Sequence, residues 1–255
     1  MNLILFEDGE FDSPLPHSDP RAQHLKKVLK RDHFEDFDAG IINGQKGKAK
    51  ITGETEKGLN LEFIPQETPP PLPSIILAVG AGRPQTAKKI LKEITALGVS
   101  QIHFFGTELG EKAYLNSSIY KEESYKPFLI EGAQQAFCTR LPDVKVHYTL
   151  KRAVETLISE GNDPNKQRNL ISACLDNYEA EASLKSFICS ELSFGKGRPE
   201  VILWIGSERG WSSDERNFFR EKNINLVSMG KRVLRTETAS VTGVSLCLAE
   251  MGLLD

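Results

Sequence analysis

The chain has 255 residues, of which 39% are hydrophobic and 26% are charged, a globular composition that argues against a disordered or fibrous protein. Its net charge of −3 argues against binding nucleic acid through an overall positive potential, although a sum over the whole chain can hide a local patch. The sequence has no apolar run close to the roughly 20 residues of a membrane helix, so we expect a cytoplasmic protein without membrane association.

The first predicted elements are short strands at residues 2–7, 34–42, 46–54 and 58–65. Asn43 and Gly44 supply the positive backbone angles that a tight hairpin turn between two of these strands demands. Short strands joined by turns of this kind predict a small β-barrel at the start of the chain.

One predicted helix interrupts these strands. Ser18 can cap it, and Pro20 suits its first turn. Basic residues outnumber acidic ones between residues 21 and 50, and one face of the helix carries several of them. A solvated charged face explains the helix taken alone, whereas an RNA contact is favoured if the rest of the chain acts on RNA. The candidate RNA-binding residues on this face are Arg21, His24, Lys27, Lys30 and Arg31.

The proline-rich segment 67–73 ends this region, because proline lacks an amide donor and restricts the residue before it. We expect a stiff linker there, between domains at residues 1–68 and 74–255. Beyond it, near-continuous apolar runs alternate with helical stretches, as in a parallel sheet that is buried on both faces. These runs are residues 74–80, 100–105, 170–176, 200–206 and 223–229.

Two of the runs lead directly into glycine and charge, and both loops are candidate binding loops. In the first, Gly206 and Gly210 bracket a turn, and Ser212 or Ser213 can cap the helix that follows. Taken alone, this loop is better interpreted as a structural turn. The second loop, 230–238, places three basic residues before a long apolar helix expected at residues 239–254. Basic residues oppose the dipole at a helix N-terminus, so an anionic ligand is expected nearby.

The two segments GSERGWSSDE and MGKRVLRTETA together resemble the paired signatures of the SPOUT superfamily. They resemble most closely the methyltransferases that act on N3 of a uridine in small-subunit ribosomal RNA, whose pattern is G-P-E-G-G followed by L-G-x-R-I-L-R-x-E-T-A. The resemblance extends along the chain through HLKKVLK, KEITALGVSQI and IEGAQQAFCTRLP. Those stretches map family positions onto His24, Gly98, Glu131, Gln135, Arg140 and Pro142.

The resemblance implies an α/β fold: a SPOUT-type parallel sheet with a C-terminal trefoil knot, preceded by a PUA-like β-barrel domain. It also implies S-adenosylmethionine as cofactor, small-subunit ribosomal RNA as partner, free or in an assembled subunit, and a homodimer. A metal is not expected, since the four cysteines lie far apart and the sulfonium of the cofactor is already activated. The dinucleotide-type glycine loop of other methyltransferases is not found, because Gly80-Ala81-Gly82 lacks a third glycine.

The resemblance also implies roles for individual residues. Around the cofactor it places Leu175, Gly206, Ser207, Glu208, Gly210, Met229, Gly230, Val233, Leu234 and Thr238. Arg232 and Arg235 are the candidate catalytic cations, because cations facing developing negative charge stabilise a transition state. Glu237 orients an arginine or accepts the proton, or else forms a purely structural pair with Arg235. Lys231 and Arg140 join the candidate RNA contacts.

The chain departs from the family pattern at several positions. Ser207 replaces a proline, Arg209 a glycine and Lys30 an arginine, and Thr107-Glu108 stand where an Arg-Ser pair is common. Arg209 places a charge beside the expected cofactor. Three alternatives therefore stay open: a different RNA target, ribose 2′-O methylation, and an RNA-binding assembly protein that retains the fold without turnover.

Overall fold

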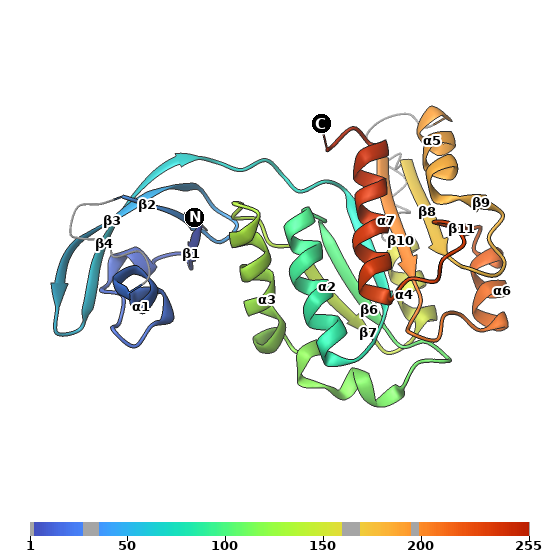
Figure 1. The fold of residues 1–255 in the computed structure, drawn as a ribbon, viewed down its shortest axis with the longest axis horizontal. Helices are drawn as coiled ribbons and strands as arrows, with labels where there is room; N and C mark the ends of the chain where they lie inside the picture. Colours follow the sequence, from blue (N-terminus) through green and yellow to red (C-terminus); the bar gives the residue numbers. More distant parts are fainter. Residues whose placement is uncertain (1–2, 28–35, 160–168, 195–198, 255) are drawn as a thin grey trace. The chain divides into compact units, whose positions relative to one another are not determined.

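The computed structural model describes residues 3–27, 36–159, 169–194 and 199–254 (Figure 1). The chain divides into two compact units. The first comprises Met1–Pro71 and Ile130–Leu141, and the second, here called the α/β unit, comprises Leu72–Leu129 and Pro142–Asp255. The sequence did not predict that residues 130–141 belong to the first unit.

The first unit contains a four-stranded sheet in the order β1-β2-β3-β4. β1 and β2 pair in parallel, whereas the other two pairs are antiparallel. A short helix, α1 (Pro20–Lys27), supplies Leu25 to a core that it shares with Phe6 and Phe37. The strands are β1 Ile4–Phe6, β2 Phe37–Ile41, β3 Lys46–Thr55 and β4 Gly58–Glu67.

Two local predictions for this unit were wrong in detail. Among the described residues of the β2–β3 turn, Asn43 (φ 59°) has a positive φ and Gly44 does not, because the turn is longer than a two-residue hairpin. The cap of α1 is Asp19 rather than Ser18. Its carboxylate accepts the backbone N–H of Arg21 at 2.8 Å, as expected for the residue directly before a helix that starts at Pro20.

The segment 130–141 joins the first unit through backbone hydrogen bonds at the β2–β3 turn. Asn43 donates its backbone N–H to Thr139 O (2.8 Å) and accepts that of Leu141 on its side chain (2.9 Å). Arg140 donates to Asn43 O at 2.9 Å and to Pro69 O at 3.2 Å. Arg140 therefore ties this segment to the turn and to the start of the linker.

The α/β unit contains a seven-stranded sheet in the order β7-β6-β5-β10-β8-β11-β9, with every pair parallel. Two of its strands were not predicted: β7 is a partly exposed edge strand, and β9 is only two residues long. The strands are β5 Ile75–Gly80, β6 Gln101–Phe105, β7 Asp143–His147, β8 Asn169–Leu175, β9 Ala182–Ser183, β10 Pro199–Ile205 and β11 Asn225–Ser228.

Helices cover both faces of this sheet. On one face α7 packs between α2 and α5, and Figure 1 shows α2 and α7 side by side. On the other face α4 and α6 bury Leu157 and Phe219 against Trp204 of β10. The helices of this unit are α2 Pro84–Leu97, α4 Leu150–Ser159, α5 Leu184–Phe194, α6 Ser213–Glu221 and α7 Thr236–Glu250. α3 (Glu122–Gln135) begins in this unit, and its residues 130–135 belong to the first unit. None of the described helices is long and apolar enough to cross a membrane.

The last helix differs from the prediction. α7 begins at Thr236, three residues earlier than expected, and ends at Glu250. The early start places Thr236 and Glu237 in its first turn, where a carboxylate is favoured by the exposed backbone N–H groups. Beyond its end, Leu253 and Leu254 are exposed.

Candidate cofactor site

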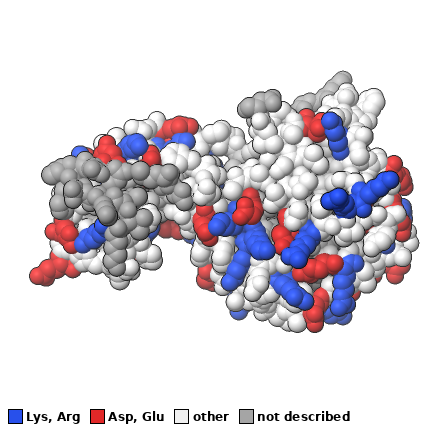
Figure 2. Space-filling model, in the orientation of Figure 1, with Lys and Arg blue, Asp and Glu red and all other residues white. Residues whose placement is uncertain are grey.

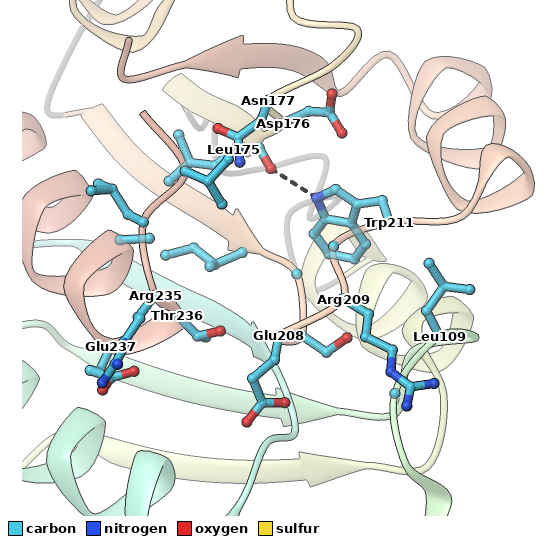
Figure 3. A pocket seen from close by; sticks show the side chains of 18 of the residues that line it. Leu109, Leu175, Asp176, Asn177, Glu208, Arg209, Trp211, Arg235, Thr236 and Glu237 are labelled. Atoms are coloured by element: carbon cyan, nitrogen blue, oxygen red, sulfur yellow. Dashed lines mark hydrogen bonds between the residues drawn. The ribbon is translucent and has the colours of Figure 1, made fainter. Parts of the chain in front are cut away.

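A cavity of about 520 Å³ lies at the carboxyl ends of β8, β10 and β11 (Figure 3). Three loops form most of its wall: residues 175–178, 205–211 and 227–237. Carboxyl ends of parallel strands are where ligands bind in open α/β sheets. The two loops singled out from the sequence therefore meet at one site.

The loop after β10 is a tight turn. Gly210 (φ 72°) donates its backbone N–H to Ser207 O at 2.9 Å. A Cβ on Gly206 would lie 3.1 Å from the carbonyl carbon of Gly210, so only glycine fits without moving the turn. Ser212 then caps α6 in a capping box with Glu215, which confirms Ser212 as the cap.

A buried carboxylate that the sequence reasoning missed holds the loop after β8. Asp176 accepts the backbone N–H groups of Tyr178 and Glu179, both at 2.6 Å, and the Nε of Arg216 at 2.7 Å. Beside it, Trp211 donates its indole N–H to the carbonyl of Leu175 at 2.8 Å (Figure 3). The signal available in the sequence was the position of Asp176, directly after an apolar run.

The loop after β11 brings Arg232 and Arg235 to the cavity wall. Its Gly230 has a φ of 115°, a backbone conformation that favours glycine. Figure 3 shows Arg235 and Glu237 on the same side of the cavity, whereas Arg209 extends toward Leu109.

Glu237 pairs with a partner that the sequence did not suggest. Its carboxylate lies 3.3 Å from Nζ of Lys89 on α2. Its own backbone N–H at the start of α7, then Lys89 and Arg235, lower the pKa of Glu237 below its usual value against the opposing effect of burial. Among the described residues its ion-pair partner is thus Lys89 and not Arg235, and Glu237 is ionised near neutral pH.

The residues expected to bind the cofactor or to act in catalysis line this one cavity, with the exception of Thr238. Thr238 and Lys231 are exposed and are not part of its wall. The expected residues that do line it are Leu175, Gly206, Ser207, Glu208, Gly210, Met229, Gly230, Arg232, Val233, Leu234, Arg235 and Glu237.

The basic residues of the first unit are largely neutralised within it. Arg21 forms ion pairs with Glu10 (2.7 Å) and Asp19 (2.8 Å) and donates to Leu5 O. The described lysines up to residue 50 whose side chains are placed, Lys26, Lys46, Lys48 and Lys50, pair with Glu54, Glu67, Asp38 and Glu62 respectively.

Of the other candidates in this region, only His24 has a side chain that the structure describes. His24 is exposed, Lys27 is the last residue of α1, and Lys30 and Arg31 lie outside the described residues. On the face of the α/β unit seen in Figure 2, Lys and Arg side chains are interspersed with Asp and Glu. The described surface in that view is thus of mixed charge.

The chain thus has a parallel sheet whose carboxyl-end loops enclose a glycine-lined cavity, with Arg232 and Arg235 among the arginines of its wall. The family model for the RNA methyltransferase domain matches residues 68–248, so the chain belongs to the RNA methyltransferases. It is 37% identical over 255 residues to the ribosomal RNA small subunit methyltransferase E of Treponema pallidum, covering 98% of this chain and 91% of that protein. Within the RNA methyltransferases, it therefore belongs to the small-subunit ribosomal RNA methyltransferase E family.

A second relative agrees with this assignment, and a solved structure shares the fold. The ribosomal RNA small subunit methyltransferase E 1 of Borreliella burgdorferi is 31% identical over 242 residues, 94% of each chain. The crystal structure of a ribosomal RNA small subunit methyltransferase E from Neisseria gonorrhoeae, bound to S-adenosyl methionine, has the same fold. Its TM-score is 0.72 at 18% identity, covering 98% of this chain and 97% of that one.

Proposed function

We propose that this protein transfers the methyl group of S-adenosylmethionine to N3 of a uridine in small-subunit ribosomal RNA. The observation that carries the proposal is that the loops 206–211 and 229–237, which resemble the two family signatures, border one cavity at the carboxyl edge of the sheet. The family membership supports ribosomal RNA as the substrate.

The residues of the cavity fit this cofactor. Its volume of about 520 Å³ is within the roughly 300–1,000 Å³ of small-molecule sites. Leu175 and Leu234 offer apolar walls, and the turn at Gly206 and Gly210 presents backbone without side chains, which suits an adenine ring that needs amide and carbonyl partners. When bound there, S-adenosylmethionine supplies a methyl group that is already activated by the sulfonium.

The protein's own contribution to the reaction is positioning and charge. Loss of the N3 proton leaves negative charge on the uracil carbonyl oxygens, and cations facing those oxygens stabilise the transition state more than the ground state. Arg232 and Arg235 line the cavity, and within the described part of the chain neither is held in an ion pair. We assign this stabilisation to them.

We assign Glu237 a positioning role rather than that of the base. A carboxylate whose pKa is lowered by its backbone N–H, Lys89 and Arg235 is a weak proton acceptor near neutral pH. Its ion pair with Lys89 instead ties the start of α7, next to Arg235, to α2. The N3 proton then leaves to solvent.

For RNA binding we retain His24, Lys27, Lys30, Arg31 and Lys231. We now give Arg21 and Arg140 a different role. Both donate hydrogen bonds inside the first unit, so we propose that they position its helix and its 130–141 segment instead of contacting phosphate.

The finer features of the fold are part of the same proposal. The first unit acts as a PUA-like barrel, and the segment from β11 to α7 is threaded in a trefoil knot. Supporting the knot, β11 lies between β8 and β9, which follow one another in the chain, so residues 176–181 have to pass around it.

We propose a homodimer in the cytoplasm, joined through the uncharged outer side of α7 that carries Thr238, Val241 and Ser245.

The decisive experiment compares ribosomal RNA from cells with and without this protein by mass spectrometry. We expect one N3-methyluridine to be missing from small-subunit RNA and to be restored by purified protein with S-adenosylmethionine. A missing ribose methyl group would overturn the N3 assignment. Cofactor binding without any change in ribosomal RNA would instead support an assembly protein.

A further inference from the structure

A second cavity, of about 600 Å³, lies in the α/β unit beside the cofactor cavity. The two cavities share Gly110 and Glu111 in their walls. Between them, Thr107 of the second cavity donates a hydrogen bond to Ser207 of the first, at 3.0 Å. A molecule in the second cavity is therefore a neighbour of whatever occupies the first.

The second cavity has apolar walls and an aromatic residue at its mouth. Its inner surface includes Ala81, Leu115, Leu150 and Phe218. Tyr148, which also lines it, is 87% exposed, an unusual position for a large aromatic side chain. Exposed aromatic rings beside apolar walls are the usual platforms on which bases of single-stranded nucleic acid stack.

Four carboxylates are among the polar groups that line this cavity. The Glu108 carboxylate accepts the hydroxyl of Ser212, and the Glu108 backbone N–H donates to Glu215 at 2.9 Å, so these two acids are partly engaged. Asp214 and Glu111 also line the cavity and are exposed. Four carboxylates disfavour an anionic ligand but suit a neutral ring that carries N–H donors.

Among the bases, those with an exocyclic amino group meet this requirement. Adenine and cytosine present amino donors, and guanine does so on its other edge, whereas uracil presents mainly carbonyl acceptors. The two lysines of the cavity, Lys112 and Lys151, are exposed and are placed to meet the phosphates that remain in solvent.

We propose that the second cavity binds one amino-bearing base of the RNA substrate, a neighbour of the target uridine, stacked on Tyr148. This inference rests on the proposed function, because it takes the occupant of the adjoining cavity to be the methyl donor. It adds a subsite that selects the sequence around the target.

The test uses the full-length protein and a small-subunit RNA fragment around the methylated uridine, once that position is mapped, or the assembled subunit if only that is methylated. Tyr148→Ala should weaken RNA binding about fivefold or more, the effect of losing one stacked base, and leave the dissociation constant of S-adenosylmethionine unchanged. The matched control is Phe194→Ala, which removes another aromatic side chain that is 84% exposed and does not line the cavity.

A second arm identifies the base. Replacing the amino-bearing bases next to the target by uracil, one at a time, should reduce affinity for the wild type at one position. The Tyr148→Ala variant should bind the original RNA and the RNA with uracil at that position equally. Ultraviolet cross-linking followed by peptide mapping should join the same nucleotide to the peptide that contains Tyr148.

The outcomes separate the two proposals. If the wild type methylates the RNA but Tyr148→Ala behaves like Phe194→Ala, the subsite is wrong and the proposed function stands. If the wild type binds cofactor but neither binds nor methylates the RNA, both the subsite and the proposed function are wrong. Cross-linking to a different surface, with unchanged base preference, also overturns the subsite.

Discussion

The hydroxyl of Thr107 donates a hydrogen bond to the hydroxyl of Ser207 at 3.0 Å, and both side chains are buried. Both residues stand at positions where the chain departs from the family pattern, Ser207 in place of a proline and Thr107 in place of an arginine. Thr107 follows β6 and Ser207 follows β10, so this bond joins two strand ends across β5. The two departures therefore act together, and the bond restrains the cofactor loop where proline does so in the family pattern.

This relationship predicts that Thr107→Val weakens S-adenosylmethionine binding. The substitution keeps the shape but removes a bond worth about 1 kcal/mol that holds the loop in its binding conformation. Affinity should fall by up to about fivefold, as far as the loop leaves that conformation. In a Ser207→Pro background the same substitution should have almost no effect, because the ring restrains the loop without a partner. Calorimetry on the wild type, the two single variants and the double variant measures how far the two substitutions are coupled in their effect on cofactor affinity. Additive effects would show that Thr107 and Ser207 do not act as a unit.

Substitution of a loop glycine tests the location of the cofactor. Gly206→Val should abolish S-adenosylmethionine binding, because even a Cβ there lies 3.1 Å from the backbone of Gly210 and a branched side chain has to enter the cavity or move the turn. Gly53→Val is the control, since its Cβ has only the Asn60 side chain within 4 Å, at 3.6 Å. Unchanged affinity in folded Gly206→Val protein would place the cofactor elsewhere.

Arg235→Ala should lower the methyl-transfer rate about 10²- to 10³-fold, the usual effect of losing one preorganised contact to developing charge. The affinities for cofactor and RNA should change far less. Single-turnover assays at saturating cofactor and RNA isolate this step. The control is Arg152→Ala on α4, an exposed arginine outside the cavity. A weaker cofactor affinity at a normal rate would make Arg235 a binding residue instead.

Charge reversal at Lys27 and Lys30 tests whether this basic segment contacts RNA. Lys27→Glu with Lys30→Glu should weaken RNA binding and flatten its dependence on salt, since each phosphate contact contributes about 0.9 to the slope of log affinity against log salt. Lys48→Glu with Lys50→Glu is a control of equal charge change, in lysines that already pair with Asp38 and Glu62. Equal slopes for the two double variants would argue against a phosphate contact by the helix.

A buried histidine predicts a pH dependence of stability. Burial, then the charges of His147 and Lys145, lower the pKa of His103 to about 3. Between about pH 3 and the usual histidine value of about 6.5, the unfolded state binds the extra proton, so the free energy of unfolding falls as the solution is acidified through this range. The slope from this group approaches about 1.4 kcal/mol per pH unit.

His103→Gln should flatten that slope, whereas His24→Gln, at an exposed position, should leave it nearly unchanged. Urea unfolding at several pH values between about 4 and 7, within the range where the two states differ in protonation, provides the measurement. If the wild type and His103→Gln lose stability in parallel over this range, His103 does not carry the effect.

The sequence alone determined the main elements and both cofactor loops. Apolar runs such as residues 200–206 bury both faces of a parallel sheet, and that requirement is local enough to be recognised within one segment. Glycine next to charge at the end of a buried strand marked both loops as candidate binding loops. Only the resemblance to the paired family signatures made the first of them more than a structural turn. β9 was not predictable, since a two-residue strand forms only because β11 lies beside it.

Only the tertiary structure decided which charges are free and which are paired. Arg21 looked like an RNA contact, yet Glu10 and Asp19 hold it. Glu237 was expected to orient an arginine, to accept the proton or to pair with Arg235, but α2 brings Lys89 to it across 148 residues of sequence. Ion pairing depends on distances of a few ångströms between side chains on different elements. The attraction between two charges falls too steeply with their separation for the pairs to be predicted from the order of residues. Strand and loop patterns, by contrast, are set by neighbours in the chain.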